Sequence, residues 1–431
     1  MNTDTAQDTP FIPAPRITTV AGYLLTRLTE AGLISIFGVP GDNNLGILDA
    51  IAARPALAWI GMATEQGAGY AADSYARQRG IGALVTTFGV GELSAMNAVA
   101  GAYAESVPVV HIVGTPALAA RESAPTLHHN LPGRDYRHFA RMAAEITAAQ
   151  ADLRAATAPE EIDRVLSTAL RTSRPVYLTI PADVADLPVL APVGRLPRAS
   201  QSLAILAAAV RSMPPRAGLA DLPPFEAAPQ ARGGPLTQRS LWARVQDFLQ
   251  PGDLLIADRG TAFYGAAALT LPDGAQLIGQ PLWASIGWSV PAALGASLAA
   301  PERRVVLIAG DGALQQTAAE LGTLLGQGLA PVIIVLNNGG YTVERATHRP
   351  DAGYHQIPGW DWTALPAAVG SVTSPVVLRA ITSQELAWAL SAAGDYAGAG
   401  RPVLIEAALA ADDAPPLLRD LTRALAAPAS G

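Results

Sequence analysis

The residues best suited to chemistry follow two apolar stretches in the last third of the chain. Gly-Asp-Gly at 310–312 comes directly after the apolar residues 305–309, and Asn-Asn at 337–338 comes directly after residues 332–336. Two adjacent strands ending there would present a carboxylate and an amide to one crevice, which is where ligands bind in open α/β sheets. Carboxylate and amide oxygens suit a hard cation that keeps phosphate ligands, so the pattern favours Mg²⁺ over zinc.

Glu65 is a second candidate for chemistry. It opens a predicted helix at residues 65–78, just after a predicted strand at residues 56–60. The helix dipole favours a carboxylate at this position, which by itself would explain the residue. The helix continues with small and apolar residues, so we expect its head to be buried. Burial favours the neutral form of a carboxyl group and suits it to exchange a proton.

Further ionisable side chains lie in loops or at predicted helix starts. His128 and His129 are adjacent in a loop, with no third metal ligand near them in the sequence, and they fit either a surface loop or a proton relay. Asp42 follows a predicted strand, and capping of the helix that opens at residues 43–45 would explain it. Glu344 fits either an exposed helical position or a site residue.

The elements that must position these residues alternate between strand and helix patterns in both halves of the chain. The predicted strands are residues 34–37, 56–60, 83–88, 109–113, 176–180, 254–257, 305–309, 332–336, 376–378 and 403–406. Such alternation predicts an α/β fold with two doubly wound parallel sheets, each covered on both faces. A Pro-rich linker at residues 191–236 separates an N-terminal domain at 1–190 from a C-terminal domain at 237–431.

Composition narrows the class of protein. Of the 431 residues, 50% are hydrophobic and 15% are charged, which predicts large buried surfaces and a subunit interface. The net charge of −7 argues against nucleic-acid binding, and the lack of cysteine excludes thiolate chemistry. Residues 1–15 lack the pattern of a signal peptide, so we expect a cytoplasmic location. Prolines interrupt the uncharged residues 274–301, which favours a buried segment over a membrane span.

Several motifs together resemble one enzyme family. They are FGVPGD at 37–42, YAAD at 70–73, TFGVGELS at 87–94, the histidine pair, QPLWASIGW at 280–288, GDG at 310–312 and NNGGYTVER at 337–345. The chain resembles the thiamine diphosphate-dependent 2-keto acid decarboxylases, most closely those acting on indolepyruvate and phenylpyruvate and then pyruvate decarboxylase. The resemblance covers about residues 17–188 and 235–425.

The resemblance implies roles for individual residues. Glu65 would hydrogen-bond the aminopyrimidine ring of thiamine diphosphate. The other residues expected to contact the cofactor are Thr261, Ala284, Ile286, Gly312, Ala313, Thr342 and Val343. The residues expected to hold Mg²⁺ are Asp311, Asn338 and the Gly340 carbonyl. The residues expected to surround a 2-keto acid and exchange protons are Asp42, His128, His129 and Glu344, with the step that each performs left open.

The resemblance also implies an activity and an assembly. We expect non-oxidative decarboxylation of a 2-keto acid with an aryl or otherwise bulky side chain, such as phenylpyruvate or indolepyruvate. A carboligase and a non-catalytic assembly partner are the alternatives. In the family the site forms between two chains, so a homodimer or homotetramer is expected.

Departures from the family pattern concern the substrate range and the domain content. They are TEQGA at 64–68, Asn43 and Asn130, together with the short linker that stands where the family has a middle domain.

Overall fold

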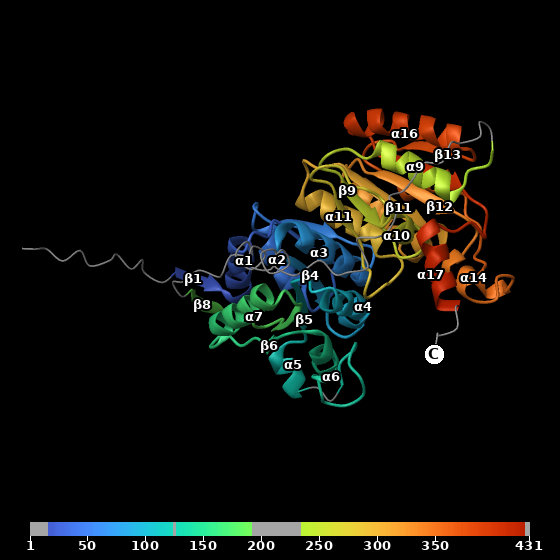
Figure 1. Cartoon of the computed structure of the whole chain (residues 1–431). Coiled ribbons are helices and arrows are strands. Elements are labelled where there is room, and N and C mark those ends of the chain that lie inside the picture. Colours follow the sequence, from blue (N-terminus) through green and yellow to red (C-terminus); the bar gives the residue numbers. More distant parts are fainter. Residues whose placement is uncertain (1–15, 124–125, 192–233, 427–431) are drawn as a thin grey trace, which may run out of the picture.

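The computed structural model describes residues 16–123, 126–191 and 234–426, which form two layered α/β units (Figure 1). The N-terminal unit contains a six-stranded parallel sheet in the order β3-β2-β4-β5-β7-β6. Its strands are β2 (Ser35–Gly38), β3 (Ala58–Gly61), β4 (Gly82–Thr87), β5 (Val109–Thr115), β6 (Gln150–Asp152) and β7 (Val176–Pro181). A separate antiparallel pair joins β1 (Arg16–Thr19) to β8 (Pro188–Ala191).

Helices connect these strands and cover the sheet. They are α1 (Val20–Glu30), α2 (Leu45–Ala52), α3 (Glu65–Arg79), α4 (Val90–Ala104), α5 (Leu118–Ser123), α6 (His138–Ala143), η1 (Ala144–Ile146) and α7 (Ala158–Thr172). The central strands β4, β5 and β7 are buried along their whole length, as expected for parallel strands covered on both faces. This burial explains why their sequences are nearly continuous apolar runs.

The C-terminal unit contains a second six-stranded parallel sheet, in the order β10-β9-β11-β12-β14-β13. Its strands are β9 (Leu254–Ala257), β10 (Gln276–Ile278), β11 (Val305–Gly310), β12 (Val332–Asn337), β13 (Val376–Ala380) and β14 (Val403–Ala408). When the strands of each six-stranded sheet are numbered along the chain, both sheets have the order 2-1-3-4-6-5. Both sheets therefore have a topological switch point beside their first strand, where ligands bind in folds of this kind.

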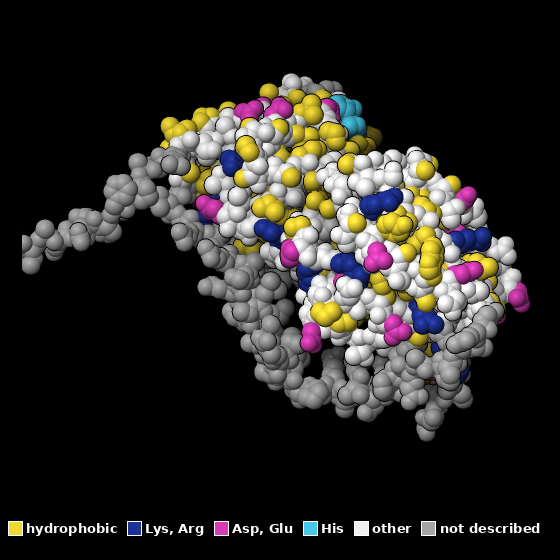
Figure 2. All heavy atoms as spheres, turned by 90° about the horizontal axis from the view of Figure 1, so that it is seen from above, with side chains coloured by type: hydrophobic (Ala, Val, Ile, Leu, Met, Phe, Trp, Pro, Cys, Tyr) yellow, Lys and Arg dark blue, Asp and Glu magenta, His cyan; other side chains and the backbone are white. Residues whose placement is uncertain are grey.

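The C-terminal helices complete the second unit. They are α9 (Gln238–Phe248), α10 (Thr261–Ala266), α11 (Ser289–Ala299), α12 (Asp311–Gln316), α13 (Ala319–Gly326), α14 (Thr342–Thr347), η2 (Gly353–His355), α15 (Leu365–Val369), α16 (Ser383–Gly398) and α17 (Pro416–Ala426). Helices α9 and α16 lie together on the outer face of this sheet, away from the N-terminal unit (Figure 1). On the face shown in Figure 2, the described acidic and basic side chains are interspersed and form no broad basic surface.

The two units meet through α3 and α11, near the centre of Figure 1. These helices are buried along most of their length and are rich in small residues. A Cβ on Gly295 would lie 2.0 Å from the backbone oxygen of Ala71, so only glycine permits this approach. Within this chain, the close packing brings the helix that begins with Glu65 against the C-terminal unit.

The structure confirms the predicted fold class of two doubly wound parallel sheets. Each predicted strand is present within a few residues of its predicted bounds, whereas the short strands β1, β6, β8 and β10 were not predicted. Most of the predicted linker lies outside the described residues. Within the part of the chain that the structure describes, no helix is long and apolar enough to cross a membrane. The uncharged residues 274–301 contain β10 and α11.

Candidate active site

A pocket of about 500 Å³ lies where β9, β11 and β12 end. It brings together every C-terminal residue that the sequence predicted for cofactor, metal or substrate contact. These are Thr261, Ala284, Ile286, Asp311, Gly312, Ala313, Asn338, Gly340, Thr342, Val343 and Glu344. Because these residues come from four separate segments, the pocket is assembled by the ends of the parallel strands and by the loop before α11.

Asp311 is fixed in this pocket by backbone amides. Its Oδ1 accepts from the amide of Gly312 at 2.8 Å, and its Oδ2 accepts from the amides of Gly339 at 2.7 Å and Gly340 at 3.1 Å. Burial raises the pKa of the Asp311 carboxyl group, while these amide hydrogen bonds lower it. The carboxylate is therefore preformed by the turns that follow β11 and β12, and a cation beside it would stabilise its charge.

The side chain of Asn338 completes a set of converging oxygens. Its amide oxygen lies 2.8 Å from the Gly340 carbonyl oxygen and 3.3 Å from Oδ1 of Asp311. With the amide turned over, its nitrogen would instead donate to both oxygens, and its oxygen would accept from the Thr342 hydroxyl at 2.9 Å. A carboxylate, an amide oxygen and a carbonyl so close together form a donor set that fits a hard cation such as Mg²⁺.

The loop that carries Ala284 and Ile286 has an unusual backbone held by a buried carboxylate. Ala284 has a φ of 60°, in the left-handed region that alanine rarely adopts, and Gly287 has a φ of 85°. Asp258 accepts from the amides of Gly287 at 3.2 Å and Ser289 at 3.1 Å. Burial raises the pKa of Asp258 to about 6. The strained loop thus presents the Ala284 backbone and the Ile286 side chain to the pocket in one defined conformation.

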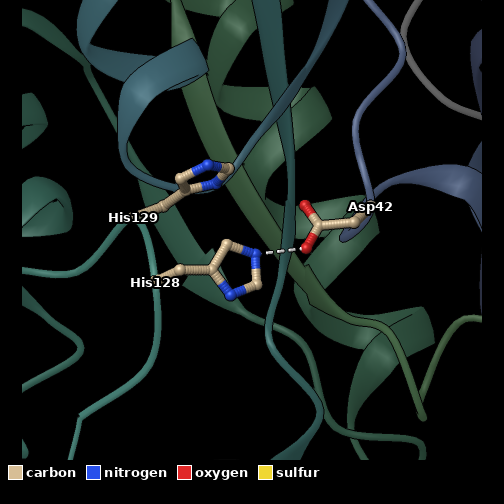
Figure 3. A group of neighbouring side chains, drawn as sticks. All are labelled: Asp42, His128 and His129. Atoms are coloured by element: carbon tan, nitrogen blue, oxygen red, sulfur yellow. Dashed lines mark hydrogen bonds and ion pairs between the residues drawn. The ribbon is translucent and has the colours of Figure 1, made fainter.

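Asp42, His128 and His129 form a separate cluster in the N-terminal unit (Figure 3). Nε2 of His128 lies 2.5 Å from Oδ2 of Asp42, and the two histidine rings meet edge to face with their centroids 4.5 Å apart. His129 has a φ of 66°. The structure thus supplies a third potential metal ligand to the histidine pair. Local sequence spacing did not reveal it, because 86 residues separate Asp42 from His128, although the family resemblance had grouped Asp42 with both histidines.

Capping was the wrong explanation for Asp42. Helix α2 begins at Leu45 with Asn44 as its N-cap, and the Asn44 side chain instead ties the preceding turn together. It accepts from the amide of Gly41 at 2.9 Å and donates to the Val39 carbonyl at 3.0 Å. With that turn held by Asn44, the Asp42 carboxylate remains available to His128.

Glu65 lies near this N-terminal cluster. Its Oε1 lies 3.1 Å from the position that a Cβ on Gly91 would take, and the Thr87 side chain lies against both Gly91 and Gly41. Thr87 also approaches Asp42, with its hydroxyl 3.5 Å from Oδ1. The prediction that the helix head is buried holds from Gly67 onward, whereas Glu65 itself is only partly buried.

Hydrogen bonds tie the segment around Glu65 to the C-terminal unit of the same chain. The hydroxyls of Tyr70 and Ser285 lie 2.7 Å apart. Glu320, fully buried in α13, accepts from the amides of Ala63 at 3.2 Å and Thr64 at 2.9 Å. Glu65 and the Asp42 cluster do not line the C-terminal pocket, and Glu344 lies with the pocket rather than with the histidines.

Sequence reasoning missed several residues that position the site. Buried Arg345 donates to the carbonyls of Gly339 at 2.8 Å and Asn338 at 3.3 Å, which fixes the turn that bears Asn338. Glu92 accepts from the amide of Gly89 and from the Tyr177 hydroxyl, and burial raises its pKa to about 7. The signal for Glu92 and for Glu320 was a single acidic residue inside an otherwise apolar helix.

Comparisons with known proteins agree with this arrangement. A family model described as the N-terminal TPP (thiamine diphosphate) binding domain of thiamine pyrophosphate enzymes matches residues 18–138, and its C-terminal counterpart matches residues 260–407. An alpha-keto-acid decarboxylase of Mycolicibacterium paratuberculosis is 40% identical, over 94% of this chain and 96% of the relative. The chain belongs to the thiamine diphosphate-dependent 2-keto acid decarboxylase family.

Other decarboxylases of this family are similarly close. Alpha-keto-acid decarboxylases of Mycobacterium avium and Mycobacterium ulcerans are 41% and 38% identical, over 94% and 96% of this chain and 96% and 97% of the relatives. The first alignment spans 548 positions although this chain has 431 residues, so the family member from M. paratuberculosis contains additional sequence. The comparisons confirm the resemblance seen in the sequence and identify the chain as a thiamine diphosphate-dependent enzyme.

Proposed function

We propose that this protein catalyses the non-oxidative decarboxylation of a 2-keto acid, with thiamine diphosphate and Mg²⁺ as cofactors. The observation that carries the proposal is the convergence of Asp311, Asn338 and the Gly340 carbonyl in a pocket beside the Ala284–Ile286 loop. The names of the relatives support the same reaction, since each is an alpha-keto-acid decarboxylase. Bound thiamine diphosphate supplies an electron sink for the electron pair that remains when CO₂ leaves the keto acid.

The C-terminal residues would bind and orient the cofactor. The oxygens of Asp311, Asn338 and Gly340 would hold Mg²⁺ against the diphosphate. The backbone amides near Gly312, Ala313, Thr342 and Val343, together with Thr261, would contact the phosphates. The Ala284 carbonyl and the Ile286 side chain would fix the pyrimidine end of the cofactor, because the strained loop allows them one conformation.

The N-terminal residues would move protons. Decarboxylation of a keto acid anion to an aldehyde and CO₂ consumes one proton per turnover, so the site needs a proton donor. Glu65 would exchange a proton with the pyrimidine ring, and the Asp42–His128 pair, with His129 beside it, would deliver a proton to the substrate carbon. Glu344, which lines the pocket, is a further candidate for proton transfer.

We further propose an aryl or otherwise bulky 2-keto acid as the substrate. The test is a screen of CO₂ and aldehyde release over aliphatic, aryl and indolyl 2-keto acids. Faster turnover of phenylpyruvate or indolepyruvate than of pyruvate would support this range, and the reverse order would contradict it. Product analysis with an added aldehyde identifies a carboligase by its hydroxyketone product.

A cytoplasmic location stays a prediction from the sequence.

The site is proposed to be shared between two chains of a homo-oligomer. Mixing and refolding Glu65→Gln chains with Asp311→Asn chains tests this. If each site takes Glu65 from one chain and Asp311 from the other, mixed dimers contain one intact site and activity returns. If each site forms within one chain, as the contacts of Glu320 and Tyr70 would also allow, every site keeps one mutation and the mixture stays inactive.

A further inference from the structure

The cluster of Asp42, His128 and His129 has the composition of a metal site as well as of a proton-transfer group. One carboxylate oxygen and one ring nitrogen from each histidine all lie within 4.8 Å of one another. Among the residues that the structure describes, this is the one group of three His, Cys, Asp or Glu side chains so placed. Figure 3 shows the two rings and the carboxylate turned toward a common space.

We propose that these three side chains bind a divalent transition-metal ion, with Zn²⁺ as the best match. Two imidazole nitrogens and one carboxylate oxygen form a donor set that zinc prefers, with a fourth position left for water or a ligand. The proposed Mg²⁺ site is different in kind, because Asp311, Asn338 and Gly340 offer oxygen atoms alone. The two sites should therefore select different ions from a mixture.

The geometry requires only small movements of exposed side chains. Ligand atoms around a tetrahedral zinc ion lie about 3.3 Å apart, so spacings that are all within 4.8 Å need to shrink by no more than about 1.5 Å. The side chains of Asp42 and His128 are 49% and 64% exposed, which leaves them free to rotate. The ion would replace the direct contact between them, which is shorter than the spacing around a metal.

His129 is the fixed member of the cluster. A Cβ on Gly89 would lie 1.9 Å from the His129 backbone oxygen, so the two backbones are in direct contact. The Nδ1 atom of His129 is buried and has no hydrogen-bond partner among the described residues. Buried ring nitrogens normally have a partner, and a bound ion or its water would supply one.

Zinc binding should inhibit the enzyme. The ion would occupy the carboxylate and the imidazoles that the proposed function uses for proton transfer, so metal and proton would compete for the same atoms. This inhibition rests on the proposed function, whereas the binding of zinc does not.

Competition with a chromophoric zinc chelator tests the binding directly. The full chain, loaded with thiamine diphosphate and excess Mg²⁺, should take up Zn²⁺ with an affinity that His129→Asn weakens at least tenfold. Asparagine tolerates the left-handed backbone of position 129, so this variant should fold. The matched control is His138→Asn, because Nε2 of His138 lies 3.9 Å from Asp135 in a pair without a second histidine.

The outcomes separate the site from the catalytic proposal. Equal zinc affinity in the wild type and His129→Asn would overturn the site. Should His129→Asn fail to fold, the exposed His128→Asn takes its place with the same expected loss. In CO₂ assays of the wild type and His138→Asn, zinc should inhibit over the range in which it binds, and chelation should restore activity. Binding without inhibition would overturn the competition, and absence of CO₂ from every substrate would count against the proposed function alone.

Discussion

Two aspartates, each placed after a parallel strand of a different unit, are held in opposite ways. Asp311 follows β11 and is 2% exposed, with its carboxylate bound by three backbone amides. Asp42 follows β2, and its carboxylate, 49% exposed, contacts the side chains of His128, Asn43 and Thr87. Backbone amides fix a charge before any ligand arrives, whereas side chains can move with the reaction. This contrast supports the proposal that the C-terminal unit holds the cofactor and that the N-terminal unit exchanges protons.

Changing Glu65 should have the largest effect, and it should lower turnover without a matching loss of cofactor affinity. We expect Glu65→Gln to lower kcat by at least about a hundredfold, since general acid–base groups contribute that much or more. Thiamine diphosphate affinity should change little, because the C-terminal pocket is intact. Steady-state CO₂ release and cofactor titration measure the two quantities. The exposed Glu160→Gln is the control, and unchanged turnover in Glu65→Gln would contradict the assignment.

Changing Asp311 should have the opposite profile. Asp311→Asn removes the charge that faces the proposed cation, so we expect Mg²⁺-dependent affinity for thiamine diphosphate to fall by at least about tenfold. Calorimetric titration of the cofactor with and without Mg²⁺ measures the effect. Asp273→Asn, at an exposed position, should bind like the wild type. If Asp311→Asn kept full cofactor affinity and full Mg²⁺ dependence, the proposal that Asp311 holds Mg²⁺ would be contradicted.

A smaller effect should follow from displacing the histidine loop. Gly89 has a φ of 68°, and a Cβ there would lie 1.9 Å from the His129 backbone oxygen. Gly89→Ala should therefore shift the cluster and lower kcat severalfold, without a matching change in cofactor affinity. Gly133→Ala is the matched control, because Gly133 has a φ of 113° but no atom within 4 Å of the added Cβ. Equal losses in the two variants would assign the effect to backbone strain alone.

The last expected effect concerns stability, with no change expected in turnover. Burial raises the pKa of Glu92 from 4.5 to about 7, so the folded state disfavours its ionised form. The unfolded chain releases this proton at lower pH, and the free energy of unfolding should fall as the pH rises from 4.5 to about 7. The expected loss is on the order of 3 kcal/mol.

Denaturant unfolding at several pH values across this range measures how the free energy of unfolding depends on pH. Glu92→Gln keeps groups that can bond to Gly89 and Tyr177 but cannot ionise, so its stability should lack this part of the pH dependence. Exposed Glu145→Gln should follow the wild type. If the free energy of unfolding of Glu92→Gln changed with pH in parallel with that of the wild type, Glu92 would not titrate in this range.

The residues proposed to hold the cofactor and Mg²⁺ were largely predictable from the sequence, because the patterns that mark them are local. Asp311 and Asn338 follow apolar strands directly, and adjacent parallel strands bring such positions to one edge. The contacts among the residues proposed to transfer protons were less predictable, because the residues that touch are far apart in the sequence. The approach of Asp42 to His128 spans 86 residues, and that of Glu320 to Thr64 spans 256. No local pattern specifies such pairs, since they depend on how loops and units pack.

Release of CO₂ by the purified chain tests the central claim most directly. One preparation is assayed with phenylpyruvate, indolepyruvate and pyruvate in the presence of thiamine diphosphate and Mg²⁺, and again after removal of each cofactor. We expect CO₂ and an equal amount of aldehyde from at least one keto acid, and only when both cofactors are present. No CO₂ from any of the three, or equal release without thiamine diphosphate, would contradict the account.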